Sequence, residues 1–357
     1  MAIDQIDPPM AAHRTNVAAA SGPTADSRRP STTMKAIVQD SYGPPASVLK
    51  LREVAKPLVS DGEVLVRVHA ASIHTGDFIL ARGLPYFLRF VTGVRKPKLR
   101  VPGTDVAGTV EAVGKDVTLF QLGDEVFGWC TGAFAEYASA TEDHFVRKPA
   151  NLTFEQASAV GVSATTALQL LRDQGKLKPG QTVLINGAAG GLGTFAVQIA
   201  KTFGTEVTGV CSTGSVDMVR SIGADHVIDY TKDDFTKGTK RYDFILDNVG
   251  NHSLAATRGA LTPNGTVQPN GGGHSAGRWI GSMGGVIKTA LSSKIERGQL
   301  APSIKTQNGK DLVALKALVE SGKVTPVIDS TFPLSRTPEA LGHVGEGHAR
   351  GTVVITM

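Results

Sequence analysis

Short runs of alternating apolar and polar residues, separated by glycine and proline, follow residue 34. Such alternation predicts β-strands that turn one face to a core. We expect these strands at residues 35–38, 63–68, 108–113 and 125–127. The first part of the chain is therefore predicted to be a β-rich domain.

After about residue 151 the pattern changes to strands that alternate with helices. Apolar residues at helical spacing predict helices over 154–172 and 193–203. Strands are expected between and after them, at 182–186, 206–211, 226–228, 243–246 and 266–267. This alternation is typical of a parallel sheet with helices on its faces, so we expect an α/β fold of the doubly wound kind.

The β pattern returns at residues 325–328 and 351–355, which indicates that the first domain recruits the end of the chain. We therefore expect a β-rich domain over 34–157, an α/β domain over 158–308, and a segment over 309–357 that returns to the first domain.

Residues 1–33 hold four prolines among Ala, Ser and Thr and lack a periodic apolar pattern, which predicts a disordered tail. Asp4 and Asp7 count against a mitochondrial presequence, because such presequences are normally poor in acidic residues. Alternatively, the tail reflects an upstream start codon, and Met34 opens the folded part.

Composition narrows the class of function. The 37 Lys and Arg against 32 Asp and Glu give a net charge of +5, which favours anionic small molecules but is too small to predict nucleic-acid binding. The two cysteines, Cys130 and Cys211, form no CxxC pair, so neither a disulfide framework nor a cysteine-rich zinc site is expected. No apolar run approaches 18 residues, so we expect no stable membrane insertion and a cytoplasmic protein.

The segment between the predicted strand 182–186 and the following helix carries the spacing GxxGxxG. Glycines there let a backbone approach a ligand closely, and the helix N-terminus favours a pyrophosphate. An ordinary strand-to-helix turn is the alternative interpretation. The predicted nucleotide contacts in this turn are Gly187, Ala189, Gly190, Gly191, Leu192 and Gly193.

The end of the second strand in such a fold discriminates between NAD and NADP, and an acidic residue there favours NAD. Here it reads Cys211-Ser212-Thr213, with no carboxylate before Asp217. We therefore predict NADPH as the cofactor, with contacts from these three residues. Ser212 and Thr213 cap helices equally well, which is the competing interpretation.

Five further motifs carry a family resemblance together with the glycine turn. They are AASIHTGD at 70–77, PGTDVAG at 102–108, GDEVFG at 123–128, GADHVIDY at 223–230 and GHARG at 347–351. Over residues 34–357 the chain resembles the zinc-independent quinone oxidoreductase branch of the medium-chain dehydrogenase/reductase superfamily. The resemblance implies a GroES-like catalytic domain, a Rossmann domain, and hydride transfer from NADPH to a quinone or an α,β-unsaturated carbonyl.

Zinc-dependent relatives take their catalytic ligands from segments that match His74, Thr104 and Gly161 here. A catalytic zinc needs three protein ligands, so we predict no metal. A quinone or enone delocalises developing negative charge itself, whereas a simple ketone or aldehyde needs polarisation.

The resemblance places His74 where relatives usually carry Asn. We expect His74 to orient or protonate the acceptor. Packing against the cofactor, or bonding to a backbone carbonyl, is the alternative. Tyr86 belongs to a loop over 84–101 that we expect to cap a hydrophobic acceptor with Tyr86, Phe87 or Phe90. The same loop carries a basic tract. Alternative interpretations of this tract are a solvated face and a contact with an anionic membrane.

The resemblance implies further cofactor contacts. Tyr230 matches a residue at the 2′-phosphate, although a plain strand-end tyrosine is the competing interpretation, and Thr166 matches a threonine near the nicotinamide. Relatives often carry Lys after HARG where Thr352 stands here, which puts a cationic contact there in doubt. The residues expected to line the nucleotide path are Asn248, Val249, Asn270, Gly271 and Gly272.

Two other functions fit the same motifs. One is an NADP-dependent alcohol or aldehyde oxidoreductase, and the other is a non-catalytic NADPH-binding scaffold or stress protein. Relatives frequently dimerise, so a homodimer is a possible assembly.

Overall fold

The computed structural model of the protein describes residues 32–270 and 307–357. The predicted tail lies outside the described residues up to residue 31. Its last residue, Thr33, begins the strand β1 (Thr33–Gln39), which pairs with β2 (Leu49–Ala55) in an antiparallel ribbon. Residues 33–357 form one structural unit.

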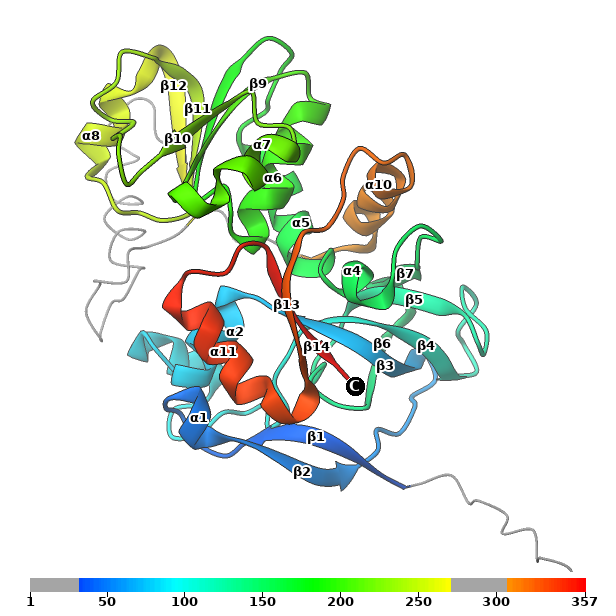
Figure 1. The fold of residues 1–357 in the computed structure, drawn as a ribbon. Helices are drawn as coiled ribbons and strands as arrows, with labels where there is room; N and C mark the ends of the chain where they lie inside the picture. The colour runs from blue at the N-terminus through cyan, green and yellow to red at the C-terminus, as the bar shows by residue number, and fades with distance from the viewer. Residues whose placement is uncertain (1–31, 271–306) are drawn as a thin grey trace, which may run out of the picture. The chain divides into compact units, whose positions relative to one another are not determined.

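A mostly antiparallel sheet of seven strands forms the first of two large sheets, with the order β13-β14-β3-β4-β5-β7 and β6 paired to β3 (Figure 1). The long central strand β3 pairs with β4, β6 and β14, so the end of the chain enters the sheet of the first domain. The strands are β3 (Glu63–Ile73), β4 (Asp105–Val113), β5 (Glu125–Trp129), β6 (Tyr137–Thr141), β7 (Phe145–Arg147), β13 (Ile328–Pro333) and β14 (Thr352–Thr356).

A parallel sheet of five strands forms the second, with the order β10-β9-β8-β11-β12. The middle of β8 is buried without alternation, as expected of a central strand covered on both faces. The predicted doubly wound α/β fold is confirmed. The strands are β8 (Thr182–Asn186), β9 (Glu206–Cys211), β10 (His226–Asp229), β11 (Tyr242–Asp247) and β12 (Leu261–Pro269).

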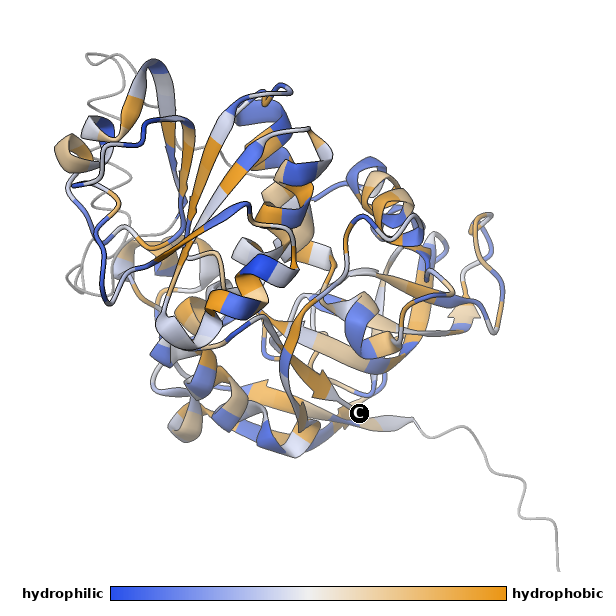
Figure 2. Cartoon of the chain, turned by 45° about the horizontal axis from the view of Figure 1, so that its top comes forward, coloured by the Kyte–Doolittle hydropathy of each residue, from blue (hydrophilic) through white to orange (hydrophobic). Residues whose placement is uncertain are grey.

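Helices surround both sheets. Hydrophobic residues concentrate in the strands and on the inner sides of the helices, and hydrophilic residues in the connecting loops (Figure 2). The helices are α1 (Pro45–Val48), α2 (Thr75–Arg82), α3 (Arg89–Thr92), α4 (Phe154–Ser158), α5 (Gly161–Gln169), α6 (Gly191–Thr202), α7 (Val216–Ser221), α8 (Leu254–Gly259), α10 (Gly309–Glu320) and α11 (Thr337–Glu346).

One hydrophobic cluster joins the two sheets. It includes Phe127 and Trp129 of β5, Leu168 of α5, Phe195 of α6 and Leu312 of α10. Because each of these side chains is buried, the glycine turn before α6 has a rigid support on the side of the core.

Two predicted elements differ from the structure. The helix predicted over 154–172 is broken into α4, α5 and a π-helical turn (Leu170–Gln174), and the first break lets the Val162 N–H reach the side chain of Asp105. The strand predicted over 325–328 is wrong for all but its last residue. The side-chain amide of Gln198 instead bonds the N–H and the carbonyl oxygen of Thr325, at 2.8 and 2.9 Å, which takes this segment out of a strand ladder.

Candidate functional site

The glycine turn between β8 and α6 is shaped by the absence of side chains. A Cβ at Gly193 would lie 2.0 Å from the Gly187 carbonyl oxygen, so only glycine lets the helix approach the strand this closely. A Cβ at Gly190 would meet nothing nearer than the same oxygen at 3.7 Å. The turn is therefore tight on the core side and open at Gly190, as a pyrophosphate-binding turn requires.

The N-terminus of α6 adds hydrogen-bond donors to this open side. Gly190 is the N-cap, and no side chain caps the helix there. The first N–H groups of a helix have no partner within the helix and carry partial positive charge. An anion at this point would bond to them.

Two buried polar atoms beside the turn lack hydrogen-bond partners among the described residues, Asn248 Nδ2 and Thr352 Oγ1. Asn248 follows β11, close to Gly187, and its oxygen accepts a bond of 2.8 Å from Asn270 Nδ2. Thr352 Oγ1 would lie 3.3 Å from a Cβ at Gly191. Buried polar atoms are normally bonded, so these orphaned atoms fit a polar ligand in the turn. The residues present therefore suit a dinucleotide.

A carboxylate, that of Asp229, lies at the end of β9, where the sequence predicted none. Because β10 pairs in parallel with β9, Asp229 comes opposite Cys211. Asp229 Oδ2 accepts a bond of 2.6 Å from Thr213 Oγ1, and Oδ1 accepts one of 2.7 Å from Thr231 Oγ1. The Thr213 hydroxyl is the main reason that the pKa of Asp229 falls to about 2. No acidic residue follows β9 directly in the sequence before Asp217, as predicted. In the structure, however, strand pairing brings Asp229 to the end of β9.

A cation lies beside the same turn. A Cβ at Gly214 would come within 2.8 Å of Arg350 Nη2, so the guanidinium of Arg350 lies against the residues after β9. The Arg350 N–H donates to Asp329 Oδ1 over 2.8 Å, and the next residue, Gly351, forms a parallel bridge with Gly190. Arg350 therefore provides a cation near the chain terminus, two residues before Thr352, where relatives often carry Lys.

The second part of the site begins at His74, directly after β3. The His74 N–H donates to Asp77 Oδ2 over 3.0 Å, and His74 Nε2 lies 3.5 Å from the same oxygen. Nε2 is buried and has no hydrogen-bond partner in the described part of the chain. Nε2 therefore faces the Asp77 carboxylate without forming a hydrogen bond to it.

A second buried acid, Asp105, interacts electrostatically with His74. Asp105 opens β4 opposite Ser72 in the β3–β4 register. Asp105 Oδ1 accepts a bond of 2.8 Å from the Val162 N–H, and Oδ2 accepts one of 3.0 Å from Ser72 Oγ. A Cβ at Gly161 would lie 2.3 Å from Asp105 Oδ1, so glycine is required at the start of α5.

Burial dominates the ionisation of both acids. It raises the pKa of Asp105 to about 7, against the lowering influence of His74, of the Val162 N–H and of Ser72 Oγ. Burial also raises the pKa of Asp77, again opposed by His74. The two carboxyl groups therefore hold protons at higher pH than ordinary aspartates.

Strand register brings the two parts of the site together. Ile73 pairs with Val353 in the antiparallel β3–β14 pair, so His74 and Thr352 lie at the same end of that pair. The bridge between Gly351 and Gly190 joins this end to the glycine turn. His74 and the glycine turn are thus linked through the β14 end of the chain.

Known proteins are similar to this chain over most of its length. Family models for the alcohol dehydrogenase GroES-like domain and for a zinc-binding dehydrogenase match residues 60–150 and 222–355. The mitochondrial NAD(P)H oxidoreductase RTN4IP1 of Mus musculus is 32% identical over 92% of this chain and 90% of its own. The 2-methylene-furan-3-one reductase of Solanum lycopersicum is 33% identical over 94% of this chain and 82% of its own.

Among solved structures, a quinone oxidoreductase from Coxiella burnetii has 30% identity and a TM-score of 0.78, and the match covers 91% of this chain and 99% of that one. The chain belongs to the medium-chain dehydrogenase/reductase superfamily. This membership makes it an oxidoreductase with a nicotinamide cofactor, and it confirms the predicted resemblance and the GroES-like and Rossmann folds.

Not every predicted site residue of this superfamily member joins the site. The Cys211 side chain lies in the hydrophobic core, where burial raises the pKa of its thiol to about 11, so it does not face a nucleotide. Tyr86 lies in the turn after α2, and the Arg89 guanidinium is 4.7 Å from the centre of its ring. Thr166 lies on α5, one turn after Val162. Gly271 and Gly272 lie outside the described residues.

The remaining nucleotide residues are placed as follows. Ala189 and Leu192 are half-buried within the glycine turn, and Ser212 and Thr213 lead from β9 into a short helical turn. Tyr230 is 54% exposed after β10.

Val249 follows β11, where its N–H bonds Asp247 Oδ1 over 3.1 Å. Asp247 also accepts from Asn186 Nδ2 over 2.8 Å, so it organises this edge of the sheet although the sequence analysis did not select it.

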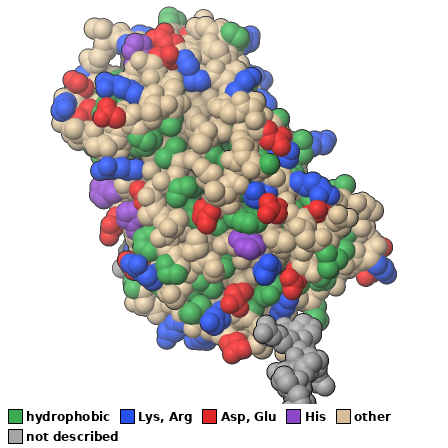
Figure 3. Space-filling model, turned by 45° about the vertical axis from the view of Figure 1, so that its right-hand side comes forward, with side chains coloured by type: hydrophobic (Ala, Val, Ile, Leu, Met, Phe, Trp, Pro, Cys, Tyr) green, Lys and Arg blue, Asp and Glu red, His purple; other side chains and the backbone are tan. Residues whose placement is uncertain are grey.

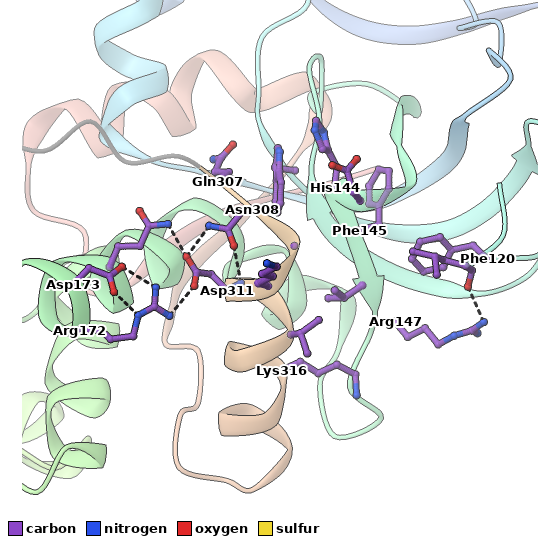
Figure 4. A pocket seen from close by; sticks show the side chains of 18 of the residues that line it. Phe120, His144, Phe145, Arg147, Arg172, Asp173, Gln307, Asn308, Asp311 and Lys316 are labelled. Carbon is purple, nitrogen blue, oxygen red and sulfur yellow. Dashed lines mark hydrogen bonds and ion pairs between the residues drawn. The ribbon is translucent and has the colours of Figure 1, made fainter. Parts of the chain in front are cut away.

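A pocket of about 1440 Å³ lies away from these residues, between β7, the π-helical turn and α10 (Figure 4). A paired cluster lies in its lining, since Arg172 bonds Asp173 and Asp311 over 2.6 and 2.7 Å, and Gln169 Nε2 donates to Asp311 over 2.7 Å. None of the predicted site residues lines it. The pocket is therefore separate from the nucleotide turn and from His74.

Within residues 32–270 and 307–357, no three His, Cys, Asp or Glu side chains are placed to hold a metal ion. In the same ranges no helix is both long and apolar enough to cross a membrane.

Proposed function

We propose that the protein is an NADPH-dependent reductase that transfers a hydride to a quinone or an α,β-unsaturated carbonyl. The observation that carries the proposal is the buried, unbonded His74 Nε2 at the end of β3, joined through β14 to the glycine turn. It supports a role for the imidazole in bonding an acceptor oxygen beside the glycine turn.

The bound nicotinamide supplies the hydride. Reduction of a quinone to a hydroquinone, or of an enone to a saturated carbonyl, takes one hydride and one proton. His74 holds the acceptor oxygen and delivers the proton as a general acid. Burial raises the pKa of Asp77, and it raises the pKa of Asp105 to about 7; each carboxylate stabilises the charged imidazolium when it is ionised.

The acceptor class follows from the polar groups available. Developing negative charge on a quinone or enone is spread over the acceptor, so one imidazole donor is sufficient. The relatives named as a quinone oxidoreductase and as a 2-methylene-furan-3-one reductase support this class.

The preference for NADPH rests on Arg350 beside the turn after β9. A guanidinium forms strong bonds with a phosphate, and the Thr213 hydroxyl lies in the same turn. Asp229 is 8% exposed, and both of its oxygens are bonded to threonines, so it is not free to hold a ribose hydroxyl as in NAD-binding folds. Tyr230, exposed after Asp229, would flank the phosphate.

The test is an acceptor panel. We expect the purified protein to oxidise NADPH in the presence of water-soluble quinones and small enones, and to do so equally with and without a chelator. Aldehydes and ketones without conjugation should be at least about tenfold slower, since they lack charge delocalisation.

Two outcomes contradict the proposal. Oxidation of alcohols by NADP that a chelator abolishes would identify a metal-dependent alcohol dehydrogenase. Tight NADPH binding without turnover on any member of the panel would identify a nucleotide-binding scaffold.

A further inference from the structure

The segment between α2 and β4 exposes large apolar side chains at its tip, residues 90–99. Phe90 is 78% exposed, Val91 73%, Val94 62% and Leu99 61%. Elsewhere in the described chain, only Leu58 and Leu122 among the large hydrophobic residues exceed 60% exposure. Four such side chains within ten residues expose apolar surface that water does not favour.

The same tip is strongly basic. Residues 84–101 contain no acidic residue, and Arg95, Lys96 and Lys98 are all exposed. The described chain provides none of these three with an acidic partner, whereas Arg100 pairs with Asp40 over 2.6 Å. The face in Figure 3 differs, because cationic and anionic side chains are interspersed on it.

The tip is held in a defined shape. The Lys98 N–H donates to the Thr92 carbonyl over 2.8 Å and closes a tight turn. Tyr42 Oη bonds both Thr92 Oγ1 and the Gly93 carbonyl at 2.8 Å. Gly93 has a φ of +123°, and a Cβ there would lie 2.0 Å from the Lys96 carbonyl oxygen, so the turn requires glycine. Its backbone is anchored while its apolar side chains stay in solvent.

We propose that this tip docks the protein on an anionic lipid surface. Phe90, Val91 and Val94 enter the boundary between headgroups and acyl chains, and Arg95, Lys96 and Lys98 bind the anionic headgroups. Apolar residues beside unpaired cations are what such a surface recognises. The tip lacks the acids that a mixed-charge protein interface carries and the aromatic platform that bases need. Because α3 has four residues, the contact is peripheral.

Vesicle binding is measured without cofactor or acceptor, so the proposal stands or fails independently of the reaction proposed above. The full chain is mixed with vesicles of phosphatidylcholine, with and without about 30% phosphatidylserine, and sedimented. We expect binding only to the anionic vesicles, and loss of binding when the salt concentration is raised from about 0.05 M to about 0.5 M.

Variants locate the contact. The triple variant Arg95→Gln/Lys96→Gln/Lys98→Gln should bind about 100-fold more weakly, since each cation near such a surface contributes about a factor of five. Phe90→Ala should bind about tenfold more weakly. The matched control, Lys50→Gln/Lys178→Gln/Lys323→Gln, removes three exposed cations elsewhere and should bind within about twofold of the wild type. Thermal unfolding of each variant checks that the fold is intact.

A fluorescent reporter gives an independent readout. The indole introduced by Phe90→Trp should shift its emission to shorter wavelength on anionic vesicles, because it leaves water. The proposal is wrong if the wild type stays in the supernatant with anionic vesicles, as expected if the tip binds a protein instead. It is equally wrong if the triple variant and the control bind alike, or if the emission of the introduced indole is unmoved while the protein sediments.

Discussion

The glycine turn and the His74 group are built in opposite ways. The turn consists of consecutive residues, Gly187 to Gly193, and its shape comes from the absence of side-chain atoms. The His74 group brings together ionisable side chains from two separate segments, His74 and Asp77 at the start of α2 and Asp105 at the start of β4. Added atoms should therefore damage the turn, whereas changes of charge and of pH should act on the His74 group.

The largest effect is expected for Gly193→Ala. The added Cβ would lie 2.0 Å from a backbone oxygen, which cannot move without displacing β8 or α6. We expect a loss of about 3 kcal/mol in the free energy of unfolding and no measurable NADPH binding. Gly342→Ala in α11 is the matched control, because a Cβ there meets nothing within 4 Å. It should raise stability by about 0.5–1 kcal/mol in denaturant unfolding. Equal stability of the two variants would contradict the account of the turn.

Asp105→Asn should change the pH dependence of stability. An acid whose folded-state pKa is raised holds its proton more tightly in the folded state. Its contribution is therefore complete below the unfolded pKa, near 4, and is lost as pH rises toward 7 and beyond. The asparagine side chain has nearly the same shape as the aspartate and does not ionise, so the variant does not lose stability in this way as pH rises. Relative to the wild type, it should gain on the order of 2 kcal/mol between pH 5 and pH 8.

Asp229→Asn should change the pH dependence of stability in the opposite direction to Asp105→Asn. The Thr213 hydroxyl chiefly lowers the pKa of Asp229 to about 2, so its contribution is present above pH 4 and disappears as pH falls toward 2. This variant should be less stable than the wild type at neutral pH, and the two should converge in acid. If both variants show the same pH trend in denaturant titrations, the assignment of the two acids is wrong.

Arg350→Ala tests whether the turn after β9 binds the 2′-phosphate of NADPH. The Arg350 guanidinium lies beside Gly214 in the turn after β9, whereas the nearby Lys232 is paired with Asp229 over 3.3 Å. We expect the Kd for NADPH to rise about tenfold and the Kd for NADH to stay unchanged. Arg336→Ala, which removes a surface pair with Glu339, is the control and should alter neither value. An equal loss for both nucleotides would contradict a role at the 2′-phosphate.

Periodicity was sufficient to predict the five strands of the parallel sheet, because strands buried on both faces read as continuous apolar runs. In the first domain it predicted the longer strands and missed β2, β6 and β7. It was insufficient at residues 325–327, where the Gln198 side chain bonds both backbone groups of Thr325 and the strand begins only at Ile328. The glycine turn was predictable because its residues are consecutive. Asp229 and Arg350 were missed at the turn after β9, since only strand pairing and the returning chain end bring them there.

The His74 group shows the same limit. Its histidine was identified through a motif, yet Asp105 acquires a role only through the Ser72 and Val162 contacts that burial imposes. Sequence gives no measure of that burial, and so no measure of the raised pKa of Asp105.

The most direct test of the account is the turnover of His74→Ala with NADPH and a water-soluble quinone. Loss of a positioned proton donor should lower kcat about 100-fold while the Kd for NADPH stays unchanged. His226→Ala on the exposed edge of β10 is the control and should retain wild-type kcat. Full turnover of His74→Ala at saturating NADPH would show that His74 neither orients nor protonates the acceptor, and would contradict the central claim.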